Sequence, residues 1–166
     1  MKTIYYTEFE FKPFRTIRLA SSEDKLVYID LNENDLHNFV NKIGFSLKKD
    51  IYSNKEVVNQ LKEYLSGDLK AFSVEAEFLT GTEFQKRVWA ELGKIPYGQV
   101  ISYKQLAEKI NNPKAFRAVG TANSKNPLPI IFPCHRVINS DGSIGGFSGG
   151  VKIKEFLLNL ELSNRD

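Results

Sequence analysis

The stretch PLPIIFPCHRVINSDG, Pro127 to Gly142, contains the only cysteine of the chain, Cys134, followed directly by His135 and Arg136. A lone cysteine is most often a small buried hydrophobic residue. This one follows Pro133, which fixes the backbone, and the histidine and arginine next to it both favour a thiolate. These neighbours favour a reactive thiol over an inert one.

The residues around the thiol leave its chemistry open. Prolines exclude a regular helix before it, and Ile130–Phe132 predicts a short buried strand. If the chain stays extended, Cys134 and His135 point to opposite sides, so a direct dyad requires a turn or a bridging water. Glu161, in the last predicted helix (151–161), could orient the imidazole from its other nitrogen.

Charge and composition bound the class of protein. The net charge is +3, but between Phe84 and Arg136 nine basic residues accompany only two acidic ones. This excess suits a polyanion such as nucleic acid, although a solvated basic face gives the same count. No apolar run could span a membrane and the N-terminus lacks a signal peptide, which predicts a cytoplasmic protein, or a nuclear one in a eukaryotic host.

The first part of the chain, residues 1–75, reads as strands followed by helices. Their apolar periodicity and the turn residues between them predict strands at 3–11, 16–20 and 25–31 and helices at 32–43 and 54–67. This order predicts a small α/β domain. The remainder, residues 76–166, is predicted to be a mostly helical second domain.

Two capped segments in the second domain predict a helix-turn-helix. Ser102 with Gln105 has the spacing of a capping box at the start of the first helix. After the turn, Asn112 as N-cap and Pro113 at the first helical position start the second helix. That helix is rich in Ala, Gly and Thr, with Arg117 as its one long cation. Such a helix allows close approach, either to another helix or to the floor of a DNA groove.

The segments GTEFQKRVWAELGKIPYGQVISYKQLAEKI, NPKAFRAVGTAN, NPLPIIFPCHRVI and GGFSGGVKIKEFLL together resemble the O6-alkylguanine-DNA alkyltransferases, also called methylated-DNA–protein-cysteine methyltransferases. The resemblance covers residues 64 to 162 in family order and spacing. It implies an α+β fold: an N-terminal ribonuclease-H-like α/β domain with a structural role, and a helical C-terminal domain for DNA binding and alkyl transfer.

The resemblance also assigns roles to residues. It implies that Cys134 accepts the alkyl group, that His135 polarises it through a water, and that Glu161 holds the histidine. Tyr103 would turn the nucleotide over and donate a proton toward the guanine. The implied catalytic group also includes the hinge residue Asn126. The implied DNA contacts are Arg117 as the finger filling the stack, Tyr103, Ala118, Gly120, Thr121, Asn123, Ser124 and Arg136. The implied base pocket consists of Val137, Ser148, Gly149, Phe147 and Pro129.

The implied activity is direct, irreversible transfer of a methyl or larger alkyl group from O6 of guanine, and less readily O4 of thymine, in a flipped-out nucleotide of duplex DNA. Each molecule would act once and would need no cofactor. The protein would be a stand-alone monomer, and the resemblance leaves open whether it binds cooperatively along DNA. Some relatives hold zinc through N-terminal cysteines. This chain has none there, so we expect no metal.

Three other functions remain as alternatives. A lesion-binding protein without chemistry would bind DNA and leave the alkyl group in place. A cysteine hydrolase would turn over many times, but the adjacent cysteine and histidine disfavour it. A thiol redox sensor would need a resolving cysteine, which the chain lacks.

Overall fold

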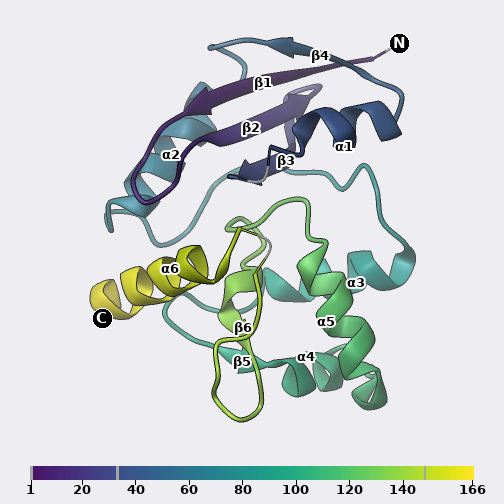
Figure 1. Cartoon of the computed structure of the whole chain (residues 1–166), viewed down its shortest axis with the longest axis vertical. Helices are drawn as coiled ribbons and strands as arrows, with labels where there is room; N and C mark the ends of the chain where they lie inside the picture. Colours follow the sequence, from purple (N-terminus) through teal and green to yellow (C-terminus); the bar gives the residue numbers. More distant parts are fainter. Residues whose placement is uncertain (1, 33, 148) are drawn as a thin grey trace. The chain divides into compact units, whose positions relative to one another are not determined.

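The computed structural model describes residues 2–32, 34–147 and 149–166 (Figure 1). The chain divides into two compact units, the first ending at Thr80 and the second beginning at Gly81. The backbone of Leu26 bonds to Glu75 and Glu77, so the stretch on both sides of the predicted boundary at 75/76 belongs to the first unit. The structural role predicted for that unit stays a prediction.

The first unit is built on a four-stranded sheet of order β3-β2-β1-β4. Strands β1 (Thr3–Phe9), β2 (Ile17–Ser22) and β3 (Lys25–Leu31) lie in the three segments predicted to be strands, and they pair antiparallel in sequence order. The fourth strand, β4 (Ser46–Lys49), pairs parallel with β1 and was not anticipated. Its polar sequence lacks the apolar alternation that identifies a strand.

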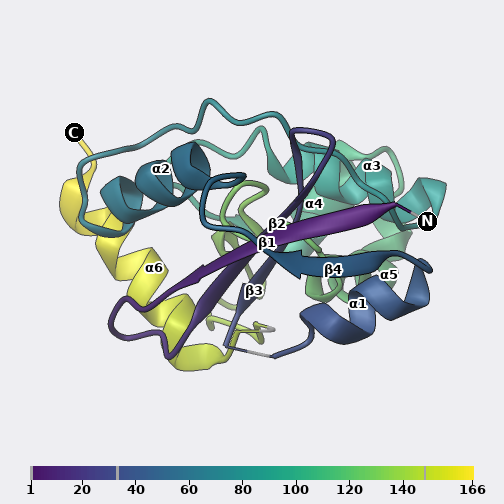
Figure 2. The same ribbon diagram turned by 90° about the horizontal axis from the view of Figure 1, so that it is seen from above.

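Two helices accompany this sheet, α1 (Leu36–Lys42) and α2 (Lys55–Leu65), both within predicted segments (Figure 2). Leu36 and Val40 of α1 join Ile4, Ala20 and Val27 of the sheet in a buried cluster. The helix starts where it does because the buried carboxylate of Asp30 accepts bonds from three consecutive backbone N–H groups at its N-terminus.

The second unit is mostly helical. Its helices are α3 (Glu83–Leu92), α4 (Tyr103–Lys109), α5 (Phe116–Ser124) and α6 (Val151–Asn164), with the short turns η1 (Pro113–Ala115) and η2 (Cys134–Arg136) and the paired strands β5 (Ile101–Ser102) and β6 (Val137–Ile138). The expected capping box of Ser102 with Gln105 is present at the start of α4, and a second capping box, Thr82 with Gln85, starts α3. No helix among the described residues is long and apolar enough to cross a membrane.

Helices α4 and α5 pack on each other and on α3 as a helix-turn-helix. The second helix starts later than predicted. Asn112 precedes a 3₁₀ turn and makes no side-chain cap, and α-helical bonding begins only at Phe116. The indole nitrogen of Trp89 donates to the carbonyl of Ala122 at 2.8 Å, which anchors α5 on α3.

The predicted strand at Ile130–Phe132 is wrong, because the chain turns there instead. Ile130 has a φ of 73°, and the N–H of Phe132 bonds back to Leu128 at 3.0 Å. The buried amide of Asn126 holds this turn: its Nδ2 donates to the carbonyl of Phe132 at 2.7 Å and its Oδ1 accepts from Leu128 at 3.0 Å. The turn delivers the chain to Cys134 as a compact loop.

Candidate functional site

Cys134 opens the 3₁₀ turn η2 and its side chain is 2% exposed. Its N–H bonds to the carbonyl of Phe132, and its own carbonyl accepts from Nδ2 of Asn123 at 3.3 Å. Because a turn replaces extended chain here, Cys134 and His135 are not forced to opposite sides. The opposite orientation of the two side chains that an extended chain would impose is therefore absent.

The expected contact between His135 and Glu161 is present. Nε2 of His135 lies 2.7 Å from Oε2 of Glu161, and both side chains are sealed from solvent. The Arg136 guanidinium donates two hydrogen bonds to the same carboxylate, from Nε at 2.8 Å and from Nη2 at 2.9 Å. The N–H of Gly98 adds a fourth bond at 3.1 Å. A buried carboxylate needs such a complete set of partners to remain charged.

These contacts set the charge states. Burial alone would raise the pKa of Glu161, but hydrogen bonds from His135 and Arg136 outweigh it and hold that pKa far below its ordinary value. Burial lowers the pKa of His135 despite the opposing pull of Glu161. We infer a neutral imidazole whose Nε2–H donates to a permanent carboxylate, so Nδ1 is the basic nitrogen.

Lys154 of α6 is a buried cation beside the thiol loop that was not expected from the sequence. Its side chain is fully buried, and Nζ donates to the carbonyls of Val137 at 2.7 Å and Gly146 at 3.2 Å. Burial lowers the pKa of Lys154 to about 8, and the negative form of Cys134 opposes that shift. A signal existed: positions 154, 157 and 161 share one face of the helix, and Leu157 marks that face as buried.

A pocket of about 360 Å³ opens onto the thiol. Tyr103, Gly120, Asn123, Ser124, Cys134, Gly146 and Phe147 line it. The parallel pairing of β5 with β6 brings the start of α4, and with it Tyr103, beside the turn that holds Cys134. Burial, and next the charge of Cys134, raise the pKa of the Tyr103 hydroxyl, while its hydrogen bond with Asn123 lowers it.

The other residues assigned to the base pocket have varied positions. Phe147 lines the cavity. Val137 is buried and its carbonyl is bound to Lys154. Pro129 is buried and Gly149 is half-buried, and neither is among the lining residues. Ser148 lies outside the described residues.

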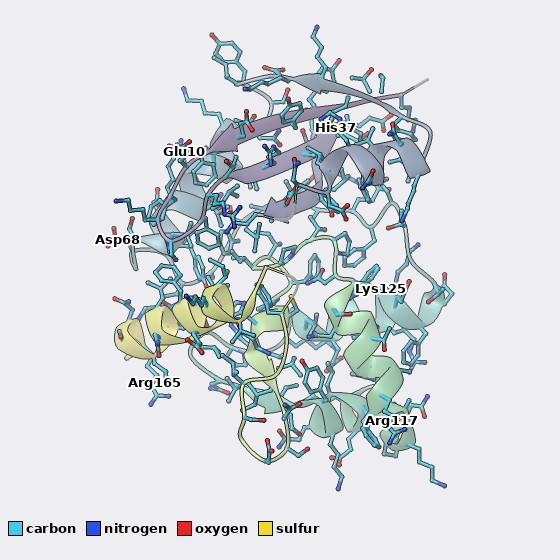
Figure 3. All side chains as sticks on the ribbon, viewed as in Figure 1. Glu10, His37, Asp68, Arg117, Lys125 and Arg165 are labelled. Atoms are coloured by element: carbon cyan, nitrogen blue, oxygen red, sulfur yellow. The ribbon has the colours of Figure 1, made fainter. Side chains whose placement is uncertain are left out.

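Four of the residues assigned to DNA contacts form the exposed face of α5: Arg117, Ala118, Thr121 and Ser124. Gly120 beside them is half-buried, and Val119 and Ala122 face the core. The small side chains of this helix therefore point outward instead of serving only to pack α5 on its neighbours. Figure 3 shows Arg117 near one end of α5 and Lys125 near the other.

Two of the residues assigned to DNA contacts are buried instead of lying on the exposed face of α5. Arg136 is 7% exposed and its guanidinium is occupied by Glu161 and by the carbonyl of Ile95. Asn123 is 4% exposed and bonded to Cys134. Neither offers much surface to a duplex: Asn123 lines the pocket at the thiol, and Arg136 neutralises the buried Glu161 carboxylate.

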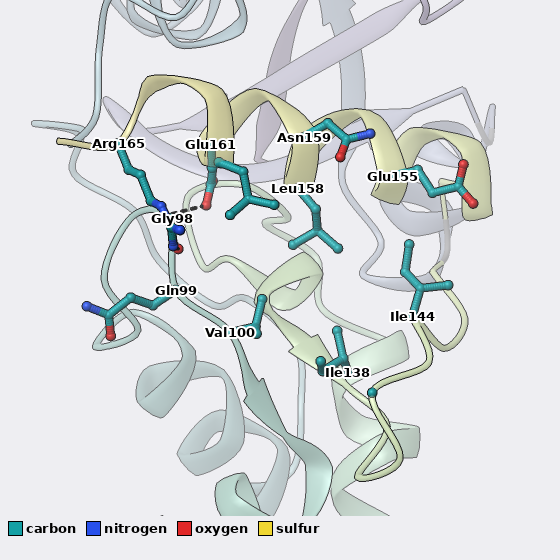
Figure 4. Close-up of a pocket in the computed structure, with 12 residues that line it drawn as sticks. Gly98, Gln99, Val100, Ile138, Ile144, Glu155, Leu158, Asn159, Glu161 and Arg165 are labelled. Carbon is teal, nitrogen blue, oxygen red and sulfur yellow. Dashed lines mark hydrogen bonds between the residues drawn. The ribbon is translucent and has the colours of Figure 1, made fainter.

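A second, larger cavity of about 480 Å³ has Glu161 among its lining residues (Figure 4). Its lining is mainly aliphatic, with Val100, Ile138, Ile144, Leu158 and Leu162. It reaches the site through Gly98, which bonds to Glu161. Among the described residues, no three His, Cys, Asp or Glu side chains come together as a metal site would require.

Comparisons with known proteins agree with this geometry. Residues 83–163 match the family described as 6-O-methylguanine DNA methyltransferase, DNA binding domain. The chain is 42% identical to the methylated-DNA–protein-cysteine methyltransferase of Methanosarcina barkeri, over 97% of this chain and 99% of that one. It is 39% identical to the constitutive enzyme of that name from Bacillus subtilis, over 95% and 94%.

Solved structures give the same result. The chain is similar to Mycobacterium tuberculosis OGT in complex with DNA, with a TM-score of 0.86, 38% identity, and coverage of 96% of this chain and 94% of that one. The O6-methylguanine-DNA methyltransferase of Pyrococcus kodakaraensis matches with a TM-score of 0.71 and 29% identity, over 95% and 98%. The predicted α+β fold with a helical C-terminal domain is confirmed.

Proposed function

The chain belongs to the methylated-DNA–protein-cysteine methyltransferase family, which repairs DNA by alkyl transfer to a cysteine, and we propose that Cys134 is that cysteine. The observation that carries this assignment is the position of the thiol. It lines a pocket of about 360 Å³, and His135, the next residue in the chain, is held by the buried carboxylate of Glu161.

The pair next to the thiol supplies the base that a thiol needs. Glu161 holds the Nε2–H of His135, which leaves Nδ1 to take the thiol proton through a water molecule. The positive charge of Lys154 favours the resulting thiolate. The histidine thus activates sulfur without being a nucleophile itself.

The transfer is a displacement at the alkyl carbon. The Cys134 sulfur forms a bond to that carbon while the bond from carbon to O6 of guanine breaks, and its electron pair goes to the guanine. The hydroxyl of Tyr103, which lines the pocket, donates a proton to the base. The proton taken by His135 returns to Tyr103 through solvent. The net result is a neutral guanine and a thioether, so each molecule reacts once without a cofactor.

Backbone carbonyls recognise the guanine. We assign those of Cys134 and Val137 as acceptors for its exocyclic amine. The Cys134 carbonyl already accepts from Nδ2 of Asn123 and from the backbone N–H of Val137, and the Val137 carbonyl accepts from Nζ of Lys154. These bonds fix the directions of both carbonyls. A guanine amine that binds the Cys134 carbonyl would therefore share that oxygen with, or displace, one of its two present donors. Ser148 and Gly149 would complete the pocket.

The substrate is a duplex with O6-alkylguanine. The alkylated atom lies on the Watson–Crick edge, so the nucleotide must leave the stack before sulfur can reach it. The small exposed side chains of α5 allow the helix to enter the minor groove, and Arg117 would fill the space left by the extruded base. We further propose that the protein acts as a cytoplasmic monomer and repairs O4-alkylthymine less readily.

Analysis of the DNA product tests this assignment. A duplex with one O6-methylguanine is incubated with a limiting amount of protein and digested to nucleosides. We expect O6-methyldeoxyguanosine to be lost in an amount equal to the protein added, and none to be lost with Cys134→Ser, which should still bind the duplex. Binding without any loss of O6-methyldeoxyguanosine in the wild type would identify a lesion-binding protein instead. A loss in excess of the protein added would identify a catalyst that turns over.

A further inference from the structure

Phe116, the first residue of α5, leaves 46% of its side chain exposed, which is unusual for a large aromatic residue in this unit. Burial of a phenylalanine ring is a principal source of folding free energy, so half-exposure forgoes much of that gain. Its ring centroid lies 6.0 Å from the guanidinium carbon of Arg117, at the limit of a cation–π contact. Packing in the core therefore does not account for this residue.

The position of Phe116 on the helix directs it toward the pocket. Positions 116, 120 and 123 share one face of α5. A Cβ placed on Gly120 would lie 3.8 Å from the Tyr103 ring, and Asn123 bonds to the carbonyl of Cys134. Phe116 therefore stands at the outer end of a row that leads past Tyr103 to the thiol.

The surroundings of Phe116 suit a polyanion. Between Glu108 and Asp141 the sequence has no acidic residue, and Lys114 and Arg117 are exposed at the end of α5 where Phe116 lies. A duplex approaching α5 would thus be drawn to this end of the helix by its phosphates. Proteins that enter the minor groove commonly insert apolar side chains such as Phe or Leu between base steps and unstack them.

We propose that Phe116 is an apolar wedge which enters the minor groove beside Arg117 and rests on the stacked base next to the extruded nucleotide. This inference rests on the proposed function. Arg117 would fill the gap, while Phe116 would hold the neighbouring step apart. The contact is made with DNA only, so the residue contributes to extrusion and not to the transfer itself.

The test compares a substrate that must be extruded with one that need not be. Single-turnover transfer is measured from a duplex with one O6-methylguanine and from O6-benzylguanine as a free base. For Phe116→Ala we expect the duplex rate to fall about tenfold or more, as for loss of one base–aromatic contact, with the free-base rate unchanged. Tyr52→Ala, which removes a 75% exposed aromatic from the other unit, should change neither rate.

A second variant separates the wedge from a cation–π role. Phe116→Leu keeps an apolar wedge and removes the π face, so we expect most of the duplex rate to return. A leucine variant as slow as the alanine variant would overturn the proposal, as would equal loss on both substrates or no loss on the duplex. If the wild type transferred nothing from either substrate, the proposed function itself would fail, which is a distinguishable result.

Discussion

The Nε2 atom of His135 and the Oε2 atom of Glu161 lie 2.7 Å apart in a part of the protein that solvent does not reach. The carboxylate is shared, because the same two oxygens also bind Arg136 and Gly98. One buried charge therefore orients the histidine, compensates the arginine and fixes the loop before β5.

This sharing predicts a specific outcome for Glu161→Gln. The amide keeps the size of the side chain but removes the charge that fixes the histidine tautomer and balances Arg136. We expect transfer from a duplex to slow by about 100-fold or more and the free energy of unfolding to fall by about 3 kcal/mol, because a buried cation loses its partner. Single-turnover kinetics and urea unfolding measure the two effects. A stable variant with wild-type transfer would show that Glu161 does not orient the base.

The pH dependence of transfer should have two limbs. Burial keeps the pKa of His135 below its ordinary value of 6.5, so the rate should fall only below that pH, as Nδ1 becomes protonated. Lys154, with its pKa near 8, should cause a second fall above about pH 8 as its charge is lost. In Lys154→Met the alkaline limb should disappear and the rate should be low at every pH. A wild-type profile flat from pH 7 to 10 would contradict this role.

Unfolding cannot explain the alkaline limb. The pKa of Lys154 is depressed in the folded state, so between about pH 8 and 10.5 the unfolded chain binds more protons than the folded one. The contribution of this group to stability therefore rises with pH in that window. Thermal melts recorded alongside the rates should show no loss of stability attributable to Lys154.

Gly120 offers a graded test of the α5 surface. An alanine Cβ would lie 3.8 Å from the Tyr103 ring, an ordinary contact, and would raise helix propensity. We expect Gly120→Ala to keep transfer and gain about 0.5–1 kcal/mol of stability. Gly120→Leu should press on Tyr103 and hinder approach of the duplex, which weakens DNA binding measured by fluorescence anisotropy. Equal duplex affinity in both variants would argue that this face does not meet DNA.

Asn123 links the acid of the site to the nucleophile. Its Nδ2 donates to the carbonyl of Cys134, and its bond with Tyr103 lowers the pKa of that hydroxyl. Asn123→Leu fills similar space without donors, so the pKa of Tyr103 should rise and its proton should be given up less readily. We expect transfer to slow by about tenfold and duplex affinity to remain. Unchanged transfer in a folded variant would remove Asn123 from the mechanism.

Much of the fold was predictable because its elements carry local signals. The strands β1 to β3 have alternating or continuous apolar residues, and capping boxes mark the first residues of α3 and α4. β4 was missed because its parallel pairing with β1 depends on a partner more than 40 residues away in sequence. The strand expected at Ile130–Phe132 is a turn, because the side chain of Asn126 satisfies its backbone groups, and no pattern of apolar residues reveals such a bond.

The residues of the site likewise fall into those that the sequence predicted and those that depend on tertiary contacts. Cys134, His135 and Glu161 were singled out by residue type and by family resemblance, and the expected bond between His135 and Glu161 is present. Lys154 was missed because a lysine between apolar helix positions is normally solvated, and only the carbonyls of Val137 and Gly146 make its burial tolerable. The burial of Arg136 likewise depends on a tertiary partner, Glu161, that lies 25 residues away.

The central claim is that Cys134 takes the alkyl group and keeps it. Intact-protein mass spectrometry after incubation with excess duplex carrying O6-methylguanine tests it most directly. We predict a gain of one methyl group per molecule, saturating at one, located on the peptide with Cys134 and absent in Cys134→Ser. An unchanged mass while the duplex is bound tightly, or a methyl group located on another residue, would contradict it.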